Sequence, residues 1–308
     1  MKMSVPVLAL LLAACQVEER GDVQAAAKTQ TTTAGGRAVK ESRQEMTRWA
    51  TSRDGTRIAF DKSGSGPALI LVSGALSQRS LLAGEPLVTM LSEHFTVYIY
   101  DRRGRGESTD VQPYAVEREI EDLDALVNEA GGSASLYGVS SGGALSLQAA
   151  ARLGPAKVTK LAIYEAPYGQ EKQDFAKQKD GVNARVRTGE PGEAAEFFLS
   201  SIGTPPEALE GMKRSPQWEA MKKIDFTLAY DYEVLGDGAV PEEVVKTIRV
   251  PALVMNGGNS MDFMKAAADR IAALIPDARR KILEGQAHQA AAEVMVPLLV
   301  EFFTGPRA

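Results

Sequence analysis

The chain has 308 residues, and its 35 Lys and Arg against 40 Asp and Glu leave a net charge of -5. Hydrophobic residues at 44% and charged residues at 24% are typical of a folded globular protein and exclude an intrinsically disordered chain. No stretch is rich enough in Lys and Arg to follow a phosphate backbone, so we expect no nucleic acid partner.

The first 14 residues have the pattern of a secretory signal peptide. Lys2 provides a positive charge, and the apolar run Val5–Ala14 follows it. This run is too short to cross a membrane, which takes about 20 residues, and a short apolar run behind a basic residue is typical of a signal peptide. Positions 12–15 read LAAC and resemble the lipobox of bacterial lipoproteins, and Cys15 is the only cysteine of the chain.

The lipobox resemblance has consequences for location. It implies that residues 1–14 are removed, that Cys15 is lipidated, and that the protein is exported and anchored to a membrane of the bacterial cell envelope. The alternative is an ordinary signal peptide followed by an incidental cysteine. After Cys15 the chain is polar and lacks apolar periodicity, so residues 15–46 are expected to form a flexible tether.

Residues 47–308 are expected to form one domain in which strands and helices alternate. The predicted strands are Thr56–Asp61, Ala68–Val72, Phe95–Tyr100, Ser135–Gly138, Lys160–Tyr164, Ala252–Met255 and Arg280–Leu283. The predicted helices are Val116–Glu129, Gly142–Leu153, Phe263–Ile275 and Ala290–Phe303. Continuous apolar strands suit a sheet that is covered on both faces. The alternation therefore predicts an α/β fold with a mostly parallel sheet and helices on both sides.

One interval, about residues 169–247, breaks this alternation. It is rich in Lys, Glu and Gly, and it reads mainly as helix. We expect an insertion that forms a helical lid over the site.

A serine lies in the motif GVSSG, at positions 138–142, between a predicted strand and a predicted helix. At such a strand-to-helix turn the nucleophile has strained backbone geometry, and its close neighbours must be glycines, here Gly138 and Gly142. The glycine spacing selects Ser140 over Ser141 as the nucleophile. The motif and its position resemble the α/β-hydrolase superfamily from about Thr47 to the C-terminus. The resemblance extends to the strand and loop FTVYIYDRRGRGES at positions 95–108, whose Asp101 is structural in that family.

A serine hydroxyl needs a base, and the chain has only two histidines. His94 precedes a predicted buried strand and is expected to be structural. His288 lies in the loop between the last predicted strand and the last predicted helix. The superfamily carries its catalytic histidine in this loop, in the order serine, acid, histidine.

The acidic residue of the triad is less clear. In most relatives it follows the penultimate strand, where this chain has Ser260 and, two residues later, Asp262. Asp262 could serve if the loop bends, or it could cap the helix that follows. Glu165 is the other candidate, because some superfamily members take the acid from the end of the preceding strand, and we favour Glu165. A site without an acid remains a third alternative.

The resemblance also implies an oxyanion hole built from two backbone N–H groups. One belongs to Ser141, directly after the nucleophile. The other belongs to Ala75, in the loop after strand Ala68–Val72, where the family usually has His-Gly and this chain has Ser73-Gly74. Both donors are main-chain groups, so the changed side chain at position 73 does not remove them.

These residues predict a serine hydrolase that acts on a small-molecule substrate, with a carboxylic ester as the leading substrate class. Amide or C–C bond hydrolysis would use the same groups. A different class of function is a non-catalytic ligand-binding or receptor-like protein that keeps the pocket without turnover. No metal or other cofactor is expected, because the sequence has no HExxH, cysteine cluster, P-loop or dinucleotide fingerprint.

Overall fold

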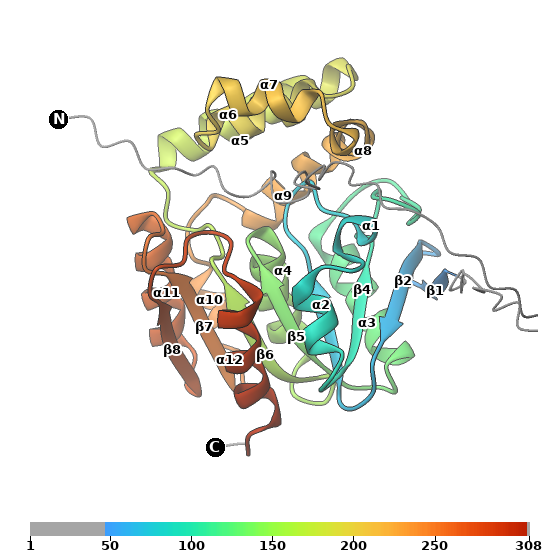
Figure 1. Cartoon of the computed structure of the whole chain (residues 1–308), viewed down its shortest axis with the longest axis vertical. Helices are drawn as coiled ribbons and strands as arrows, with labels where there is room; N and C mark the ends of the chain where they lie inside the picture. The colour runs from blue at the N-terminus through green and yellow to red at the C-terminus, as the bar shows by residue number, and fades with distance from the viewer. Residues whose placement is uncertain (1–46, 307–308) are drawn as a thin grey trace, which may run out of the picture.

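A mostly parallel sheet of eight strands forms the centre of the protein (Figure 1). The structure is a computed structural model that describes residues 47–306, so the predicted signal peptide, Cys15 and the whole of the predicted tether lie outside the described residues. The strand order is β1-β2-β4-β3-β5-β6-β7-β8. The strands are β1 (Arg48–Thr51), β2 (Arg57–Ser63), β3 (Ala68–Val72), β4 (Thr96–Tyr100), β5 (Ala134–Val139), β6 (Val158–Tyr164), β7 (Ala252–Gly257) and β8 (Ala278–Leu283).

Antiparallel pairing is confined to one edge of the sheet, where β1 pairs with β2 and β2 pairs with β4. All other neighbours are parallel. Strand β1 was not predicted, because this edge strand buries only Ala50 and carries no apolar run. Strand β8 was predicted to begin at Arg280, two residues late.

Helices cover both faces of the sheet. Helices α2 (Pro86–Leu91) and α12 (Ala292–Thr304) pack on one face. On the other face lie α3 (Val116–Glu129), α4 (Ser141–Leu153) and α11 (Asp262–Leu274). The residues of β3 alternate between the two cores, with Leu69 and Leu71 on the α12 side and Ile70 and Val72 on the α4 side. A strand that is buried on both faces has no polar position, and for this reason β3 reads as a continuous apolar run.

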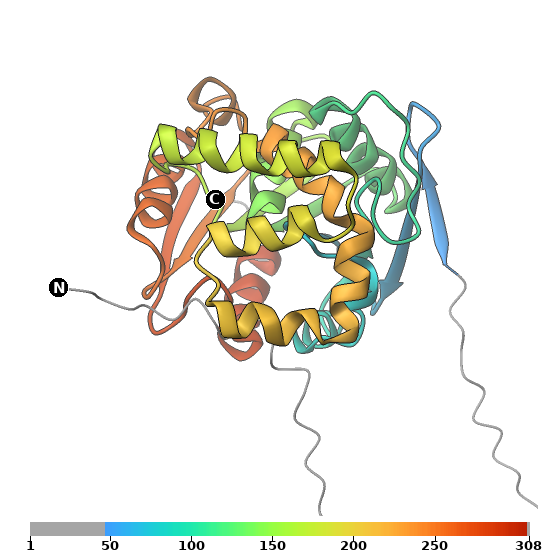
Figure 2. The same cartoon turned by 90° about the horizontal axis from the view of Figure 1, so that it is seen from above.

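Between β6 and β7 all regular secondary structure of the described chain is helical. The helices are α5 (Lys172–Thr188), α6 (Glu193–Ser201), α7 (Pro206–Lys213), α8 (Pro216–Ile224), a short 3-10 helix η1 (Asp225–Thr227), α9 (Leu228–Leu235) and α10 (Glu242–Val245). Helices α5 to α8 lie above one end of the sheet (Figure 1), and a view from above shows them over the central elements (Figure 2). A short helix α1 (Arg79–Leu82) follows β3. Among residues 47–306, no helix combines the length and the apolar character that a membrane span requires.

Candidate active site

Ser140 occupies the sharp turn between β5 and α4. Its backbone angles, φ 56° and ψ -131°, lie outside the regions that ordinary residues adopt. The two glycines of the motif make this turn sterically feasible. A Cβ on Gly142 would lie 2.1 Å from the carbonyl oxygen of Val72, and a Cβ on Gly138 would lie 2.4 Å from Ser146 Oγ. The turn therefore requires glycine at both positions and presents the Ser140 side chain at the carboxyl end of the sheet.

Strained backbone is concentrated around this serine. Among the described residues, the non-glycine residues with positive φ are Leu76, Ser140 and Glu165, at 54°, 56° and 53°. Ser140 and Glu165 directly follow β5 and β6, and Leu76 lies in the loop after β3; these three strands are neighbours in the sheet. Strain of this kind costs about 1–3 kcal/mol per residue and clusters at functional sites. The three strained positions mark the same site as the sequence motif.

Glu165 and His288 are joined by a hydrogen bond of 2.7 Å between Glu165 Oε2 and His288 Nδ1. Glu165 is 1% exposed, and its other oxygen, Oε1, accepts hydrogen bonds from the Gly257 N–H at 2.8 Å and from the Ser260 hydroxyl. Burial raises the pKa of Glu165, but the hydrogen bonds from His288, Ser260 and Gly257 outweigh it and hold the pKa below its ordinary value. The carboxylate is therefore ionised at neutral pH and can orient and stabilise an imidazole that gains a proton.

Backbone contacts bring the Ser140 turn to the end of β6, next to Glu165, although among residues 47–306 no hydrogen bond joins the Ser140 hydroxyl to His288. The Ser140 N–H donates to the carbonyl oxygen of Tyr164 at 3.0 Å, so the nucleophile position abuts the residue before Glu165. The Tyr164 phenol donates to the carbonyl oxygen of Ala287, and this bond fixes the loop immediately before His288. The end of β6 thus contacts the serine on one side and the histidine loop on the other.

The structure does not bring Asp262 to the histidine. Asp262 is the first residue of α11, its side chain is exposed, and it lies 3.4 Å from Lys265 Nζ. Ser260, at the position where the superfamily resemblance led us to expect an acid, instead donates a hydrogen bond to Glu165. His94 is exposed and precedes β4, at the opposite end of the sheet from Ser140.

Both expected oxyanion-hole donors belong to segments beside Ser140. A Cβ on Gly74 would lie 2.9 Å from Ser140 Cβ, so the loop after β3 passes directly against the nucleophile. Within residues 47–306, neither the Ala75 N–H nor the Ser141 N–H donates to a protein acceptor. Two unpaired donors beside a serine are the arrangement that an oxyanion hole requires.

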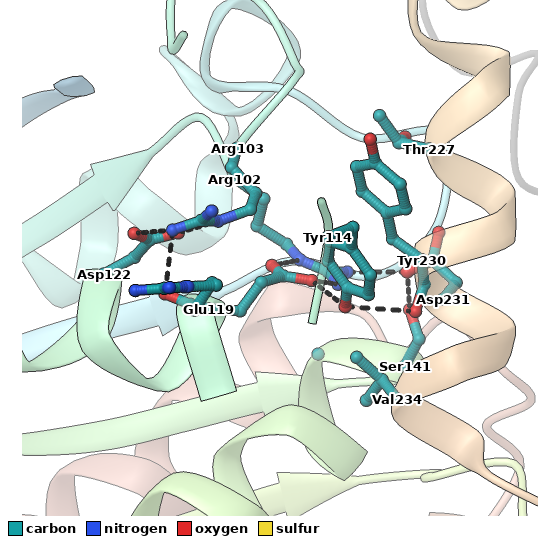
Figure 3. Close-up of polar contacts among 12 residues, drawn as sticks. Arg102, Arg103, Tyr114, Glu119, Asp122, Ser141, Thr227, Tyr230, Asp231 and Val234 are labelled. Atoms are coloured by element: carbon teal, nitrogen blue, oxygen red, sulfur yellow. Dashed lines mark hydrogen bonds and ion pairs between the residues drawn. The ribbon is translucent and has the colours of Figure 1, made fainter. Parts of the chain in front are cut away.

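A buried group of charged residues next to the site was not found from the sequence. Asp231, in α9, accepts hydrogen bonds from the Ser141 hydroxyl at 2.7 Å and from Arg102 at 2.6 Å (Figure 3). The sequence did carry a signal for it, since three arginines follow the buried strand β4 and a single aspartate interrupts the apolar segment LAYDY.

A cleft of about 460 Å³ lies elsewhere, between α1 and α8. Its lining includes Arg79, Asp101 and Lys223 but neither Ser140 nor His288, so it is separate from the candidate site. Within the described part of the chain, no group of three or more His, Cys, Asp or Glu side chains is arranged to hold a metal ion.

Comparisons with known proteins agree with this architecture. Residues 69–297 match the model of the alpha/beta hydrolase family. The solved structure of an alpha/beta hydrolase from Sphaerobacter thermophilus is 44% identical, covers 83% of this chain and all of its own, and superposes with a TM-score of 0.73. A 2-(acetamidomethylene)succinate hydrolase from Mesorhizobium japonicum is 26% identical over 74% of this chain and 83% of its own length.

A more distant structure shares the fold alone. It is the enol-lactonase from Burkholderia xenovorans, which is 22% identical, covers 83% of this chain and all of its own, and has a TM-score of 0.62. The family match spans more than two thirds of the sequence and includes nearly all of β3, the serine turn and the histidine loop. The chain therefore belongs to the alpha/beta hydrolase family.

Proposed function

We propose that this protein is a serine hydrolase that cleaves carboxylic esters through an acyl-enzyme on Ser140. The observation that carries the proposal is the buried Glu165 carboxylate, bonded to His288 Nδ1 next to a serine on a strained strand-to-helix turn. A buried carboxylate is costly unless it is paired, and a carboxylate bonded to Nδ1 of a histidine orients the imidazole and stabilises it when it gains a proton. The non-catalytic, receptor-like alternative gives no reason for this carboxylate.

The geometry suggests a role for each group. With the Nδ1–H of His288 donating to Glu165, the other ring nitrogen, Nε2, has a free lone pair and can take the proton of the Ser140 hydroxyl. Ser140 then attacks the ester carbonyl, and the N–H groups of Ala75 and Ser141 stabilise the oxyanion. The protonated His288 next donates its proton to the leaving alcohol. Finally, a water activated by His288 releases the acid from the acyl-enzyme.

Ester cleavage is the preferred reaction among three that the same groups could perform. An alcohol is a better leaving group than an amine or a carbanion. The triad and the two oxyanion donors therefore suffice for ester cleavage without a further catalytic group. The names of the relatives, an enol-lactonase and a 2-(acetamidomethylene)succinate hydrolase, describe hydrolytic reactions and support the general class.

A fluorophosphonate probe and a substrate panel test the proposal. The probe should label the wild type and a Ser133→Ala control, in which an exposed serine just before β5 is removed, but not Ser140→Ala. p-Nitrophenyl esters of rising chain length should be hydrolysed faster than the matching anilides. Labelling of Ser140→Ala, or a folded wild type that neither reacts with the probe nor hydrolyses any ester, would contradict the proposal.

We also propose that the protein is exported and held at a membrane of the cell envelope by lipid on Cys15. The proposal rests on the residues LAAC at positions 12–15. In a bacterial host, metabolic labelling with a palmitate analogue should mark the wild type and leave Cys15→Ser unlabelled and released from the membrane fraction. Equal labelling of both would contradict lipidation at this residue.

A further inference from the structure

Four charged side chains are buried together beneath the candidate oxyanion hole. Arg102 and Arg105 are each 1% exposed, Glu119 is 2% exposed and Asp231 is 3% exposed. A buried ion cluster is weak evidence for stability, because an apolar cluster of similar volume is often equally stable. Because the cluster lies next to the candidate site, its presence has a second explanation besides stability, which is a role in the site.

This cluster contacts the two segments that carry the oxyanion donors. Arg105 Nη1 donates to the carbonyl oxygen of Gly74 at 2.6 Å, and Arg105 Nη2 donates to Asp231 Oδ2 at 2.8 Å. Asp231 Oδ1 accepts the hydroxyl of Ser141 at 2.7 Å, as Figure 3 shows. One guanidinium–carboxylate pair thus links the loop after β3 to the first residue of α4.

The contact with Gly74 bears on the direction of the Ala75 N–H. The Gly74 carbonyl and the Ala75 N–H belong to the same trans peptide unit, in which the two bonds point in opposite directions. A guanidinium that holds the carbonyl on one side therefore aims the N–H at the other. A charged donor on the carbonyl oxygen also polarises the peptide and strengthens its N–H as a donor.

The second donor is held in a similar way. The Ser140 carbonyl accepts the Gly143 N–H at 2.9 Å, so the Ser141 N–H of the same peptide points away from the helix. The Ser141 side chain is fixed by Asp231. Burial raises the pKa of Asp231, but Arg105 and Arg102 outweigh it and hold the pKa below its ordinary value, so this carboxylate stays charged.

We propose that Arg105, held by Asp231, is a positioning residue that orients and polarises the Gly74–Ala75 peptide as a donor to the oxyanion. The inference rests on the proposed function and deepens it, because it assigns a task to the buried cluster. Asp231 belongs to α9, so the helical insertion contributes a residue to the site as well as a cover.

The loop offers a matched control. Arg103 is 0% exposed, and it bonds Asp122 at 2.7 Å and Asp54 at 2.9 Å on the side away from the oxyanion segments. Replacing either arginine with methionine removes one buried guanidinium from the same loop. Only the Arg105 replacement releases the Gly74 carbonyl.

The experiment compares Arg105→Met, Arg105→Lys and Arg103→Met with the wild type, using p-nitrophenyl butyrate as substrate and phenylboronic acid as a tetrahedral mimic that forms an adduct with the serine. Removing one oxyanion donor costs about 10²–10³ in kcat, and a misdirected donor should cost about 10- to 100-fold. Arg105→Met should lose this factor in kcat, keep KM within about threefold, and bind the boronic acid correspondingly more weakly. Arg105→Lys keeps the charge but cannot reach both partners, so its kcat and boronic acid affinity should fall between those of the wild type and Arg105→Met. If the methionine variant does not fold, Arg105→Lys provides the test.

Arg103→Met should lower the melting temperature and leave kcat and boronic acid affinity within about threefold of the wild type. Equal losses in the Arg105 and Arg103 variants, or a loss of kcat in Arg105→Lys with unchanged boronic acid affinity, would overturn the positioning role. If Ser140-dependent turnover is seen and the Arg105 variants match the wild type, only this inference fails. If the wild type has no such turnover, the proposed function fails with it.

Discussion

Replacing Glu165 with glutamine is the sharpest test of the acid assignment. The substitution keeps the shape of the side chain and removes its charge. In the structure, Oε1 of Glu165 accepts two hydrogen bonds, from the Gly257 N–H and the Ser260 hydroxyl, while Oε2 faces His288. Two donors fix the amide oxygen of glutamine at the Oε1 position, so its NH₂ group must face the histidine.

That orientation forces the wrong tautomer on the imidazole. Facing an N–H donor, His288 Nδ1 must accept, and the ring proton then sits on Nε2, which can no longer take the serine proton. A triad histidine held in the wrong tautomer costs about 10⁴ in kcat, which corresponds to about 5.5 kcal/mol at 1.36 kcal/mol per factor of ten. We expect this loss in Glu165→Gln, with KM little changed.

Initial rates on p-nitrophenyl butyrate, with the fraction of folded protein measured by circular dichroism, provide the assay. Asp262→Asn is the paired variant, because within residues 47–306 its exposed carboxylate forms an ion pair with Lys265 alone, and it should keep kcat within about twofold. A Glu165→Gln enzyme within tenfold of the wild type would refute the tautomer argument. A comparable collapse in Asp262→Asn would instead assign the acid to Asp262.

Three further results are expected. Gly142→Ala puts a Cβ 2.1 Å from the Val72 carbonyl oxygen and should lower the free energy of unfolding by about 3 kcal/mol; urea unfolding that matches the wild type would contradict this. Tyr164→Phe removes the phenol that holds the Ala287 carbonyl, so kcat should fall about tenfold and stability by about 1 kcal/mol, which rates and melting curves together would check. The folded pKa of Glu165 is lowered, so its charge stabilises the fold above the unfolded pKa of about 4.3, and this contribution is lost as pH falls through the folded value. Urea unfolding from pH 7 to pH 3 should therefore show wild type and Glu165→Gln converging in stability, and a constant difference would argue against the shift.

The predicted architecture was recovered where burial leaves a clear pattern in the sequence. The helix Val116–Glu129 has the predicted bounds, because its apolar residues recur at helical spacing against polar neighbours. The strand Ala68–Val72 was found because both of its faces are buried. Short or half-exposed elements, such as β1 and α1, carry too few apolar residues to be seen.

The site could be predicted in part for the same physical reason. The glycines around Ser140 and the loop position of His288 are local features, and a single sequence contains them. The partnership of Glu165 with His288 joins residues 123 positions apart, and that of Asp231 with Ser141 joins residues 90 apart. Pairings of this kind depend on how the strands and the insertion are placed in space. For this reason the sequence favoured Glu165 as the acid without deciding it, and it gave no role to the buried arginines.

Ser260, in the loop after β7, reaches the carboxylate that Glu165 places at the end of the neighbouring strand β6. Either strand end could therefore carry the acid of the triad. Because Ser260 already reaches this carboxylate, an aspartate at position 260 would bring a second carboxyl group to the same hollow. Sequence screens that accept an aspartate only after β7 will therefore sort proteins of this kind among inactive homologues.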